Sequence, residues 1–249
     1  SSAPTWTQDI FGTPEFKPIA HLRDTVAAVR HIIAGAHKGL QPYEGEYFKA
    51  SFRELKPTEP PLRSKIPIWV AALREKLLRV GVEIADGVIG HPMWSPNWAV
   101  DEMGPVIADA LAQSGRQRAE LEVNVWPWMA INEDRKQAID DARGSIAFYA
   151  STSVYESFFE AHGFLAEARA CQAEIKQGVD VQSLKKHVPD AMVETFAACG
   201  PMDEVAEKVE PFWRIADSMC PTPPIWGLPE EKVQYYAQAL AGFVHAQNA

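Results

Sequence analysis

Apolar residues change their spacing twice between residues 66 and 90. Branched side chains alternate at Ile66, Ile68 and Val70, which is typical of a buried β-strand. The next stretch repeats its apolar positions every three or four residues, as an amphipathic helix does; these positions are Leu77, Leu78, Val80 and Ile84. A second apolar run covers 86–90. The pattern predicts one β-strand, a crossover helix and a second, parallel β-strand.

The rest of the chain continues this alternation. Helical spacing predicts further helices, at 21–33, 100–113, 133–150 and 230–245, and one that opens near Met202. Further strands are predicted at 122–129 and 222–226. Residues 41–61 are extended, with a turn at Glu44 and Gly45. Residues 151–193 are polar and helical, and longer than a strand-to-helix connection needs, so we expect an insertion that covers the mouth of a single domain spanning 1–249.

Four strands alternating with helices make half of a (β/α)8 barrel, the α/β fold that takes about 250 residues in one domain. An open half would leave two strand edges unpaired in water. We therefore expect that the gene product is longer, or that a second chain supplies the missing half. A homodimer is the expected assembly.

Composition narrows the classes of function. The 249 residues carry a net charge of −9, which disfavours general binding to nucleic acid or to an anionic membrane surface. Three widely spaced cysteines predict reduced thiols in a cytoplasmic protein, and no metal-ligand spacing occurs. No apolar run approaches the ~20 residues of a membrane span. Chemistry on a small-molecule substrate fits this composition.

Several motifs, in order along the chain, resemble one known family. They are Y-E-G-E-Y-F at 43–48, P-I-W-V-A-A at 67–72, V-E-I-A-D-G-V-I at 82–89 followed by H-P, A-F-Y-A-S-T-S-V-Y at 147–155 and G-P-M-D-E-V-A-E-K-V at 200–209. Together they resemble the bacterial luciferase-like monooxygenase superfamily, and within it the deazaflavin (coenzyme F420) dependent oxidoreductases. The resemblance implies a TIM barrel of which this chain holds strands five to eight, beginning at Ser1–Pro4 after strand four.

The resemblance also implies a cofactor site. In relatives the loop after strand five offers backbone N–H groups to the cofactor phosphate; by position it is Ala71, Ala72, Leu73 and Arg74 here. Relatives commonly have Gly-Pro where this chain has Arg74 and Glu75. The guanidinium would attract phosphate and the carboxylate would repel it. Alternatively, both side chains simply solvate the start of a helix.

Gly90 and His91 follow strand six, where the family also contacts the phosphate. We expect His91 to contact the phosphate or the ring rather than to transfer a proton. The alternative is a structural histidine at a strand end. The resemblance assigns no catalytic acid or base; in the family such residues come from the half that this chain lacks.

Aromatic residues are the candidate substrate contacts. They are Trp94 in the loop after His91, Trp126 and Trp128 in the third strand, and Tyr149, with Tyr155, in or near the insertion. Strand alternation places Trp126 and Trp128 on one face, where they could wall a flavin-like ring. Core packing is the alternative for each of these aromatic residues.

The expected function is hydride transfer between F420 and a small organic substrate. One alternative is an FMN-dependent monooxygenase that uses reduced flavin and O2. Another is a non-catalytic half-barrel that binds a partner chain or a lumazine-like ligand.

Overall fold

The computed structural model describes residues 12, 17–63 and 65–247. It divides into two compact units. Unit 1 takes the described residues up to Ile89 together with Pro105–Val123, and unit 2 takes Gly90–Gly104 and the described residues from Asn124 onward.

Unit 1 begins with a helix and a hairpin. Helix α2 covers Pro18–Gly35, and the short strands β1 (Tyr43–Glu44) and β2 (Lys49–Ala50) pair antiparallel. The helix predicted at 21–33 is therefore confirmed. The predicted turn is present but lies one residue later, because Glu44 ends β1 opposite Lys49 and the Gly45 N–H donates to the carbonyl of Phe48.

A buried carboxylate joins the α2 helix to this hairpin. Asp24 accepts the backbone N–H groups of Tyr47 (2.6 Å) and Phe48 (2.9 Å) and the hydroxyl of Tyr43. A Cβ atom on Gly45 would lie 1.9 Å from the Asp24 carboxylate. The turn needs glycine for this reason, and the hydrogen bonds hold the pKa of Asp24 below its usual value.

The predicted strand, helix and parallel strand form the sheet of unit 1. They are β3 (Trp69–Ala71), α3 (Glu75–Ile84) and β4 (Gly87–Ile89), with Trp69 opposite Gly87. The first strand is shorter than the 66–72 expected. Pro67 has no N–H for a ladder, and the N–H of Ile68 bonds the Asp86 carboxylate at 2.9 Å. Next to β4 in the strand order lies β5 (Glu122–Val125), whose first two residues belong to unit 1.

The strand predicted at 122–129 is wrong as one element. The chain breaks it at Trp126 and Pro127, because proline cannot donate to the ladder, and continues as β6 (Trp128–Ile131). Strand β6 pairs in parallel with β7 (Ala197–Gly200), a strand that the sequence pattern did not reveal.

The strand predicted at 222–226 is also wrong. The observed strand is β8 (Ser218–Met219), which pairs in parallel with the second half of β5. Prolines at 221, 223 and 224 remove ladder donors, so pairing after Cys220 is reduced to one isolated bridge between Thr222 and Trp128.

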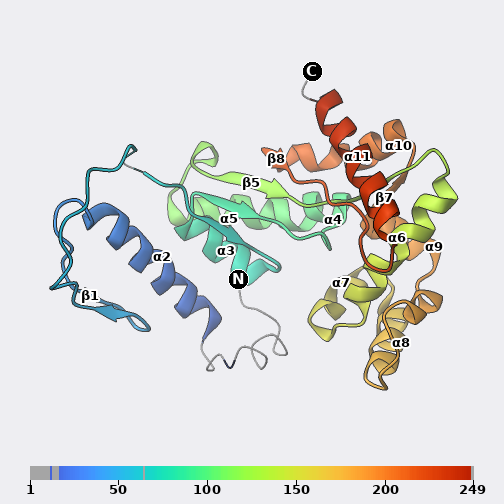
Figure 1. Ribbon diagram of the computed structural model, residues 1–249, viewed down its shortest axis with the longest axis horizontal. Helices are drawn as coiled ribbons and strands as arrows, with labels where there is room; N and C mark the ends of the chain where they lie inside the picture. The colour runs from blue at the N-terminus through green and yellow to red at the C-terminus, as the bar shows by residue number, and fades with distance from the viewer. Residues whose placement is uncertain (1–11, 13–16, 64, 248–249) are drawn as a thin grey trace. The chain divides into compact units, whose positions relative to one another are not determined.

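Helices make up most of unit 2. A helical run begins with α4 (Pro96–Trp98), earlier than the predicted 100–113, and passes through a π-helical turn (Ala99–Met103). It continues as α5 (Gly104–Ser114), which from Pro105 onward belongs to unit 1. The others, in chain order, are α6 (Arg135–Ala150), α7 (Glu156–Ala161), α8 (Leu165–Ile175), α9 (Asp190–Phe196), α10 (Met202–Val209) and α11 (Glu230–Gln247). Helix α6 packs on β6 and β7 and against α8 and α9 (Figure 1).

Residues 151–193 are helical, as predicted, and short 3-10 turns interrupt them at Ser153–Tyr155 and Ser183–His187. That they cover a barrel mouth stays a prediction. The paired strands β3 and β4, β5 and β8, and β6 and β7 are all parallel, as an α/β fold requires. No closed barrel occurs among the described residues. The expected start at Ser1–Pro4 lies outside them.

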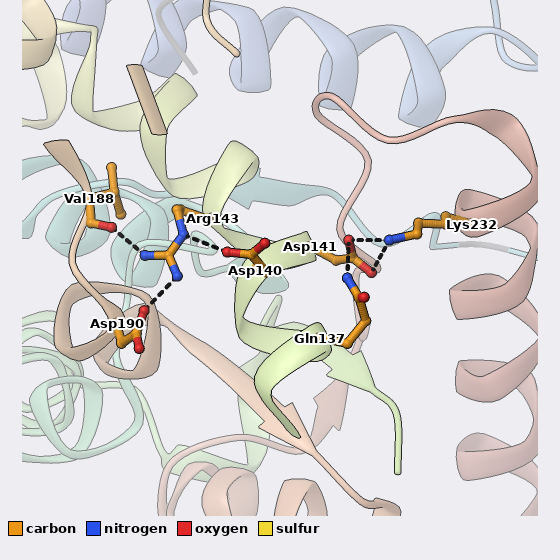
Figure 2. Close-up of polar contacts among 7 residues, drawn as sticks. All are labelled: Gln137, Asp140, Asp141, Arg143, Val188, Asp190 and Lys232. Atoms are coloured by element: carbon orange, nitrogen blue, oxygen red, sulfur yellow. Dashed lines mark hydrogen bonds and ion pairs between the residues drawn. The ribbon is translucent and has the colours of Figure 1, made fainter. Parts of the chain in front are cut away.

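A buried polar cluster joins α6 to α11 in unit 2. The carboxylate of Asp141, 5% exposed, accepts Lys232 Nζ (2.7 and 3.0 Å), Gln137 Nε2 (3.0 Å) and the hydroxyl of Tyr236 (2.9 Å). We call these four residues the Asp141 cluster; Figure 2 shows its lysine and glutamine. On the same helix Arg143 bonds Asp190 and the carbonyl of Val188, which ties the end of the insertion to α6 (Figure 2).

Two absences hold within the described part of the chain. No helix there is long and apolar enough to cross a bilayer. No group of three histidine, cysteine, aspartate or glutamate side chains is arranged to hold a metal ion. The three cysteines, all described, are free thiols, as predicted.

Candidate functional site

The loop after β3 leaves fewer backbone donors open than the sequence implied. The N–H of Ala72 bonds the carbonyl of Ile89 at 2.8 Å, so the sheet already uses it. Arg74 is the N-cap residue of α3, and its carbonyl accepts the N–H of Leu78. Glu75 pairs with Arg79 at 3.0 Å on the helix surface, which agrees with a solvated helix start. Phosphate binding by Ala71, Ala72, Leu73 and Arg74 stays a prediction for this loop.

The loop after β4 is packed under a tryptophan. A Cβ atom on Gly90 would lie 2.7 Å from the ring of Trp94, so only glycine fits. The Gly90 N–H donates to the carbonyl of Asn124 at 2.7 Å. The ring of Trp94 is 1% exposed, so packing is its observed role. Substrate contact by Trp94 and cofactor contact by Gly90 stay predictions.

His91 is held in one tautomer. Its Nδ1 accepts the backbone N–H of Met93 at 3.2 Å, which places the ring proton on Nε2. Burial lowers the pKa of His91 from 6.5 to about 4, so the ring is neutral at pH 7. His91 is therefore a fixed neutral donor.

Two tyrosine rings contact this histidine, and a tryptophan ring contacts one of them. Tyr155 stacks on the imidazole with ring centres 5.2 Å apart and planes at 29°, and Tyr149 meets it edge-on at 5.3 Å. Tyr149 in turn contacts Trp128 at 6.1 Å. We call these four residues the His91 cluster. The structure thus brings together four residues that the sequence analysis named, His91, Trp128, Tyr149 and Tyr155.

Burial shapes the chemistry of the His91 cluster. It raises the pKa of Tyr149 to about 12, with a smaller contribution from Tyr155, and it raises the pKa of Tyr155 as well. The Trp128 indole N–H is fully buried and has no hydrogen-bond partner in the described part of the molecule. The cluster therefore carries neutral rings, one buried N–H donor without a partner among the described residues, and no charge at pH 7.

Trp126 does not share the environment of Trp128. Trp126 is 39% exposed and Trp128 is 3% exposed, so the prediction of one common face is wrong. The cause is Pro127, which ends β5 and breaks the alternation between the two residues. Substrate contact by Trp126 stays a prediction.

The His91 cluster suits a flat, conjugated ligand. Aromatic faces supply contact area, and isolated N–H donors can bond ring carbonyl or nitrogen atoms. An unpaired buried donor is costly, by about 1–3 kcal/mol, and such groups often mark a place where a ligand or water completes the bonding.

Comparison with protein families matches residues 1–216 to the family described as luciferase-like monooxygenase. The chain belongs to this family. The luciferase-like assignment made from the sequence motifs is thereby confirmed, and the parallel strand pairs agree with it.

Two individual proteins of known sequence are similar to most of this chain. A protein of Mycobacterium tuberculosis described as uncharacterized is 30% identical over 201 residues, which cover 79% of this chain and 59% of the relative. The 5,10-methylenetetrahydromethanopterin reductase of Archaeoglobus fulgidus is 28% identical over 199 residues, covering 78% of this chain and 56% of the reductase. The chain thus spans less than two thirds of the length of these relatives.

A solved structure supports the fold. The coenzyme F420 dependent tetrahydromethanopterin reductase from Methanopyrus kandleri superposes with a TM-score of 0.74 at 22% identity, over 95% of this chain and 70% of that chain.

Sequence reasoning missed one polar pair in unit 2. The hydroxyl of Ser95 lies 2.8 Å from His162 Nε2, although the two residues are 67 positions apart. No local pattern links them, because the insertion folds back on the loop after β4 only in three dimensions.

Proposed function

We propose that this luciferase-like chain forms the cofactor-binding part of an oxidoreductase that transfers a hydride between coenzyme F420 and a small organic substrate. The His91 cluster carries the proposal. Similarity to a methylenetetrahydromethanopterin reductase, and a fold shared with an F420-dependent reductase, favour F420 among the cofactors of the family.

The residues of the cluster fit a deazaflavin ring. Tyr149 and Trp128 would pack beside it, and the buried indole N–H, which has no partner among the described residues, would gain an acceptor on the ring. His91 would donate from Nε2 as a neutral group, because its pKa is about 4. When bound, the cofactor supplies the hydride chemistry, and the protein excludes water and orients one face of the ring.

Two loops are proposed for the cofactor phosphate, each within its own unit. In unit 1 it is the loop before α3, where the first N–H groups of a ten-residue helix favour an anion. In unit 2 it is the Gly90–His91 turn. A homodimer, a cytoplasmic location and the barrel assignment of strands five to eight belong to the same proposal.

Anaerobic fluorescence titration of the purified chain with F420 and with FMN tests the cofactor. We expect F420 to bind more tightly than FMN. Binding is the readout because the chain covers only part of its relatives, so turnover by the chain alone is not required. Equal binding of the two cofactors would contradict the preference for F420. Absence of binding to either would contradict the proposal as a whole and favour a non-catalytic half-barrel.

The second candidate is an FMN-dependent monooxygenase, which the description of the family itself favours. Tighter binding of reduced FMN, followed by rapid flavin oxidation and substrate oxygenation when O2 is admitted, would support it against the F420 proposal.

A further inference from the structure

Ser95 and His162 form a hydrogen-bonded pair within unit 2. Ser95 precedes α4 at its N-cap position, but its hydroxyl makes no capping bond and instead lies 2.8 Å from His162 Nε2. His162 follows α7, in the insertion. A serine at this position usually caps its own helix; here its side chain faces a histidine from a distant segment.

The imidazole of His162 is oriented as a base. Its Nδ1 lies 2.7 Å from the carbonyl of Phe158, which can only accept a hydrogen bond, so the ring proton is on Nδ1. Nε2 therefore carries the lone pair and accepts the Ser95 hydroxyl. Phe196 packs on the ring at 4.7 Å. Burial lowers the pKa of His162, so the imidazole is neutral at pH 7.

Both side chains line a cavity of about 790 Å³. This volume is within the range of small-molecule sites. The ring of Trp98, together with Pro96 and Pro211, gives the cavity apolar wall, and the amide of Asn97 adds a polar donor. Ser95 is only 6% exposed, so its hydroxyl is largely screened from bulk water.

We propose that Ser95 is a nucleophile, with His162 as its general base, for small neutral carboxylic esters bound in this cavity. A nucleophile bonded to a base, which a third group orients, is the arrangement that activates serine. The third group here is a backbone carbonyl instead of a carboxylate. This activity is separate from the proposed hydride transfer and does not depend on it.

The reaction balances without a redox partner. The Ser95 oxygen attacks the ester carbonyl carbon while its proton passes to His162 Nε2. The bond to the alkoxy group then breaks, and the leaving alcohol takes the proton from His162. Water attacks the acyl-serine in the same way, which releases the carboxylic acid and restores Ser95. Asn97 also lines the cavity, and its amide is the proposed donor to the carbonyl oxygen as that oxygen gains negative charge.

The charged side chains on the cavity wall indicate which class of ester would bind. The cavity wall carries two cations, Arg135 and Lys208, and three carboxylates, Glu194, Glu204 and Glu207. Arg135 already bonds Glu194 at 2.7 Å and also Glu204. Because carboxylates outnumber cations on this wall, an anionic ester would be repelled. A neutral ester with an aryl or short alkyl group would pack on Trp98.

Hydrolysis of p-nitrophenyl acetate by the purified chain tests the pair. Ser95→Ala removes the nucleophile. His162→Gln keeps an acceptor for the Ser95 hydroxyl but cannot take up a proton. We expect each variant to lose at least about 100-fold in kcat/KM, the lower range for general base catalysis. Matched controls are Ser114→Ala and His187→Gln, whose side chains bond elsewhere, to Ala110 and Glu174. They should keep the original rate.

Covalent labelling of the unaltered chain gives a result that does not depend on variant folding. A fluorophosphonate probe, followed by peptide mapping, should label Ser95, and p-nitrophenyl acetate should compete with it. Labelling confined to other residues, or wild-type hydrolysis by both Ser95→Ala and His162→Gln, would overturn the proposal and leave a structural hydrogen bond between the insertion and the loop.

Discussion

Unit 2 contains two buried polar clusters that differ in how completely their groups are paired. In the Asp141 cluster one carboxylate accepts hydrogen bonds from Lys232, Gln137 and Tyr236. In the His91 cluster, by contrast, the indole N–H of Trp128 is fully buried and has no acceptor in the described part of the chain, and His91 carries a neutral Nε2–H donor.

This difference separates a structural role from a binding role. A fully paired buried group holds two elements together and offers nothing to a ligand. An unpaired buried donor costs free energy in the empty protein, and a ligand that supplies an acceptor recovers it. Changes in the Asp141 cluster should therefore affect stability alone, whereas changes in the His91 cluster should affect ligand binding.

The largest expected effect concerns the stability of the His91 cluster in acid. The pKa of His91 is about 4 in the folded chain and 6.5 in an unfolded one. The unfolded state therefore takes up a proton first, and stability falls as the pH drops from about 6.5 to about 4, then levels off. The gap between the two values corresponds to a loss of about 3 kcal/mol.

Urea unfolding of the original chain and of His91→Phe across pH 4 to 7 measures this loss. Phenylalanine keeps a ring beside Tyr155 but does not titrate, so the acid loss should be smaller by about 3 kcal/mol. Other groups, His162 included, titrate in both proteins and cancel. Parallel pH curves for the two proteins would show that His91 is not buried as a neutral ring.

The second prediction removes the cation from the Asp141 cluster. Lys232→Met leaves a 5% exposed carboxylate without its ion pair. Because the lysine itself is partly exposed, we expect a loss of about 2 kcal/mol in unfolding free energy, below the 3–5 kcal/mol of a fully buried pair. Cofactor affinity should be unchanged. The control is Lys136→Met. Lys136 is an exposed lysine on α6, the helix that carries Asp141, and its replacement should alter stability little.

The third prediction tests the Nε2–H donor of His91. His91→Phe keeps ring packing and loses Nε2–H, so F420 affinity at pH 7 should fall by roughly tenfold, about 1.4 kcal/mol, the scale of one hydrogen bond. Fluorescence titration measures it. Affinity equal to that of the original chain would return His91 to a purely structural role.

Parts of the fold and of the candidate site were predictable from the sequence. The unit from β3 to β4 was predictable because its periodicity is local and each crossover between parallel strands needs a helix. The family was predictable from ordered motifs. The sequence named His91, Trp128 and Tyr149 as candidates because they lie at strand ends or in a motif; the structure brings them together, and their roles stay predictions.

What failed depended on backbone donors and on long-range contacts. Prolines at 127, 221, 223 and 224 decide where strands stop, and a hydropathy pattern does not weigh a missing N–H. The N–H groups of Ala72 and Gly90 donate to backbone carbonyls, which the sequence pattern did not show; phosphate contact by these two loops stays a prediction. The stack of Tyr155 on His91 and the bond from Ser95 to His162 join segments more than 60 residues apart; nothing local in the sequence encodes them.

The smallest expected effect distinguishes the two clusters most directly. Trp128→Phe deletes the unpaired indole N–H and keeps an aromatic ring against Tyr149. The smaller ring leaves a void that costs stability, while the lost donor no longer needs an acceptor, so the two terms oppose each other. We expect the unfolding free energy in urea to change by less than about 1 kcal/mol, while F420 affinity falls severalfold. Were Trp128 fully paired like Asp141, the same substitution would reduce stability by more than it reduces binding, and that outcome would contradict the division between the two clusters.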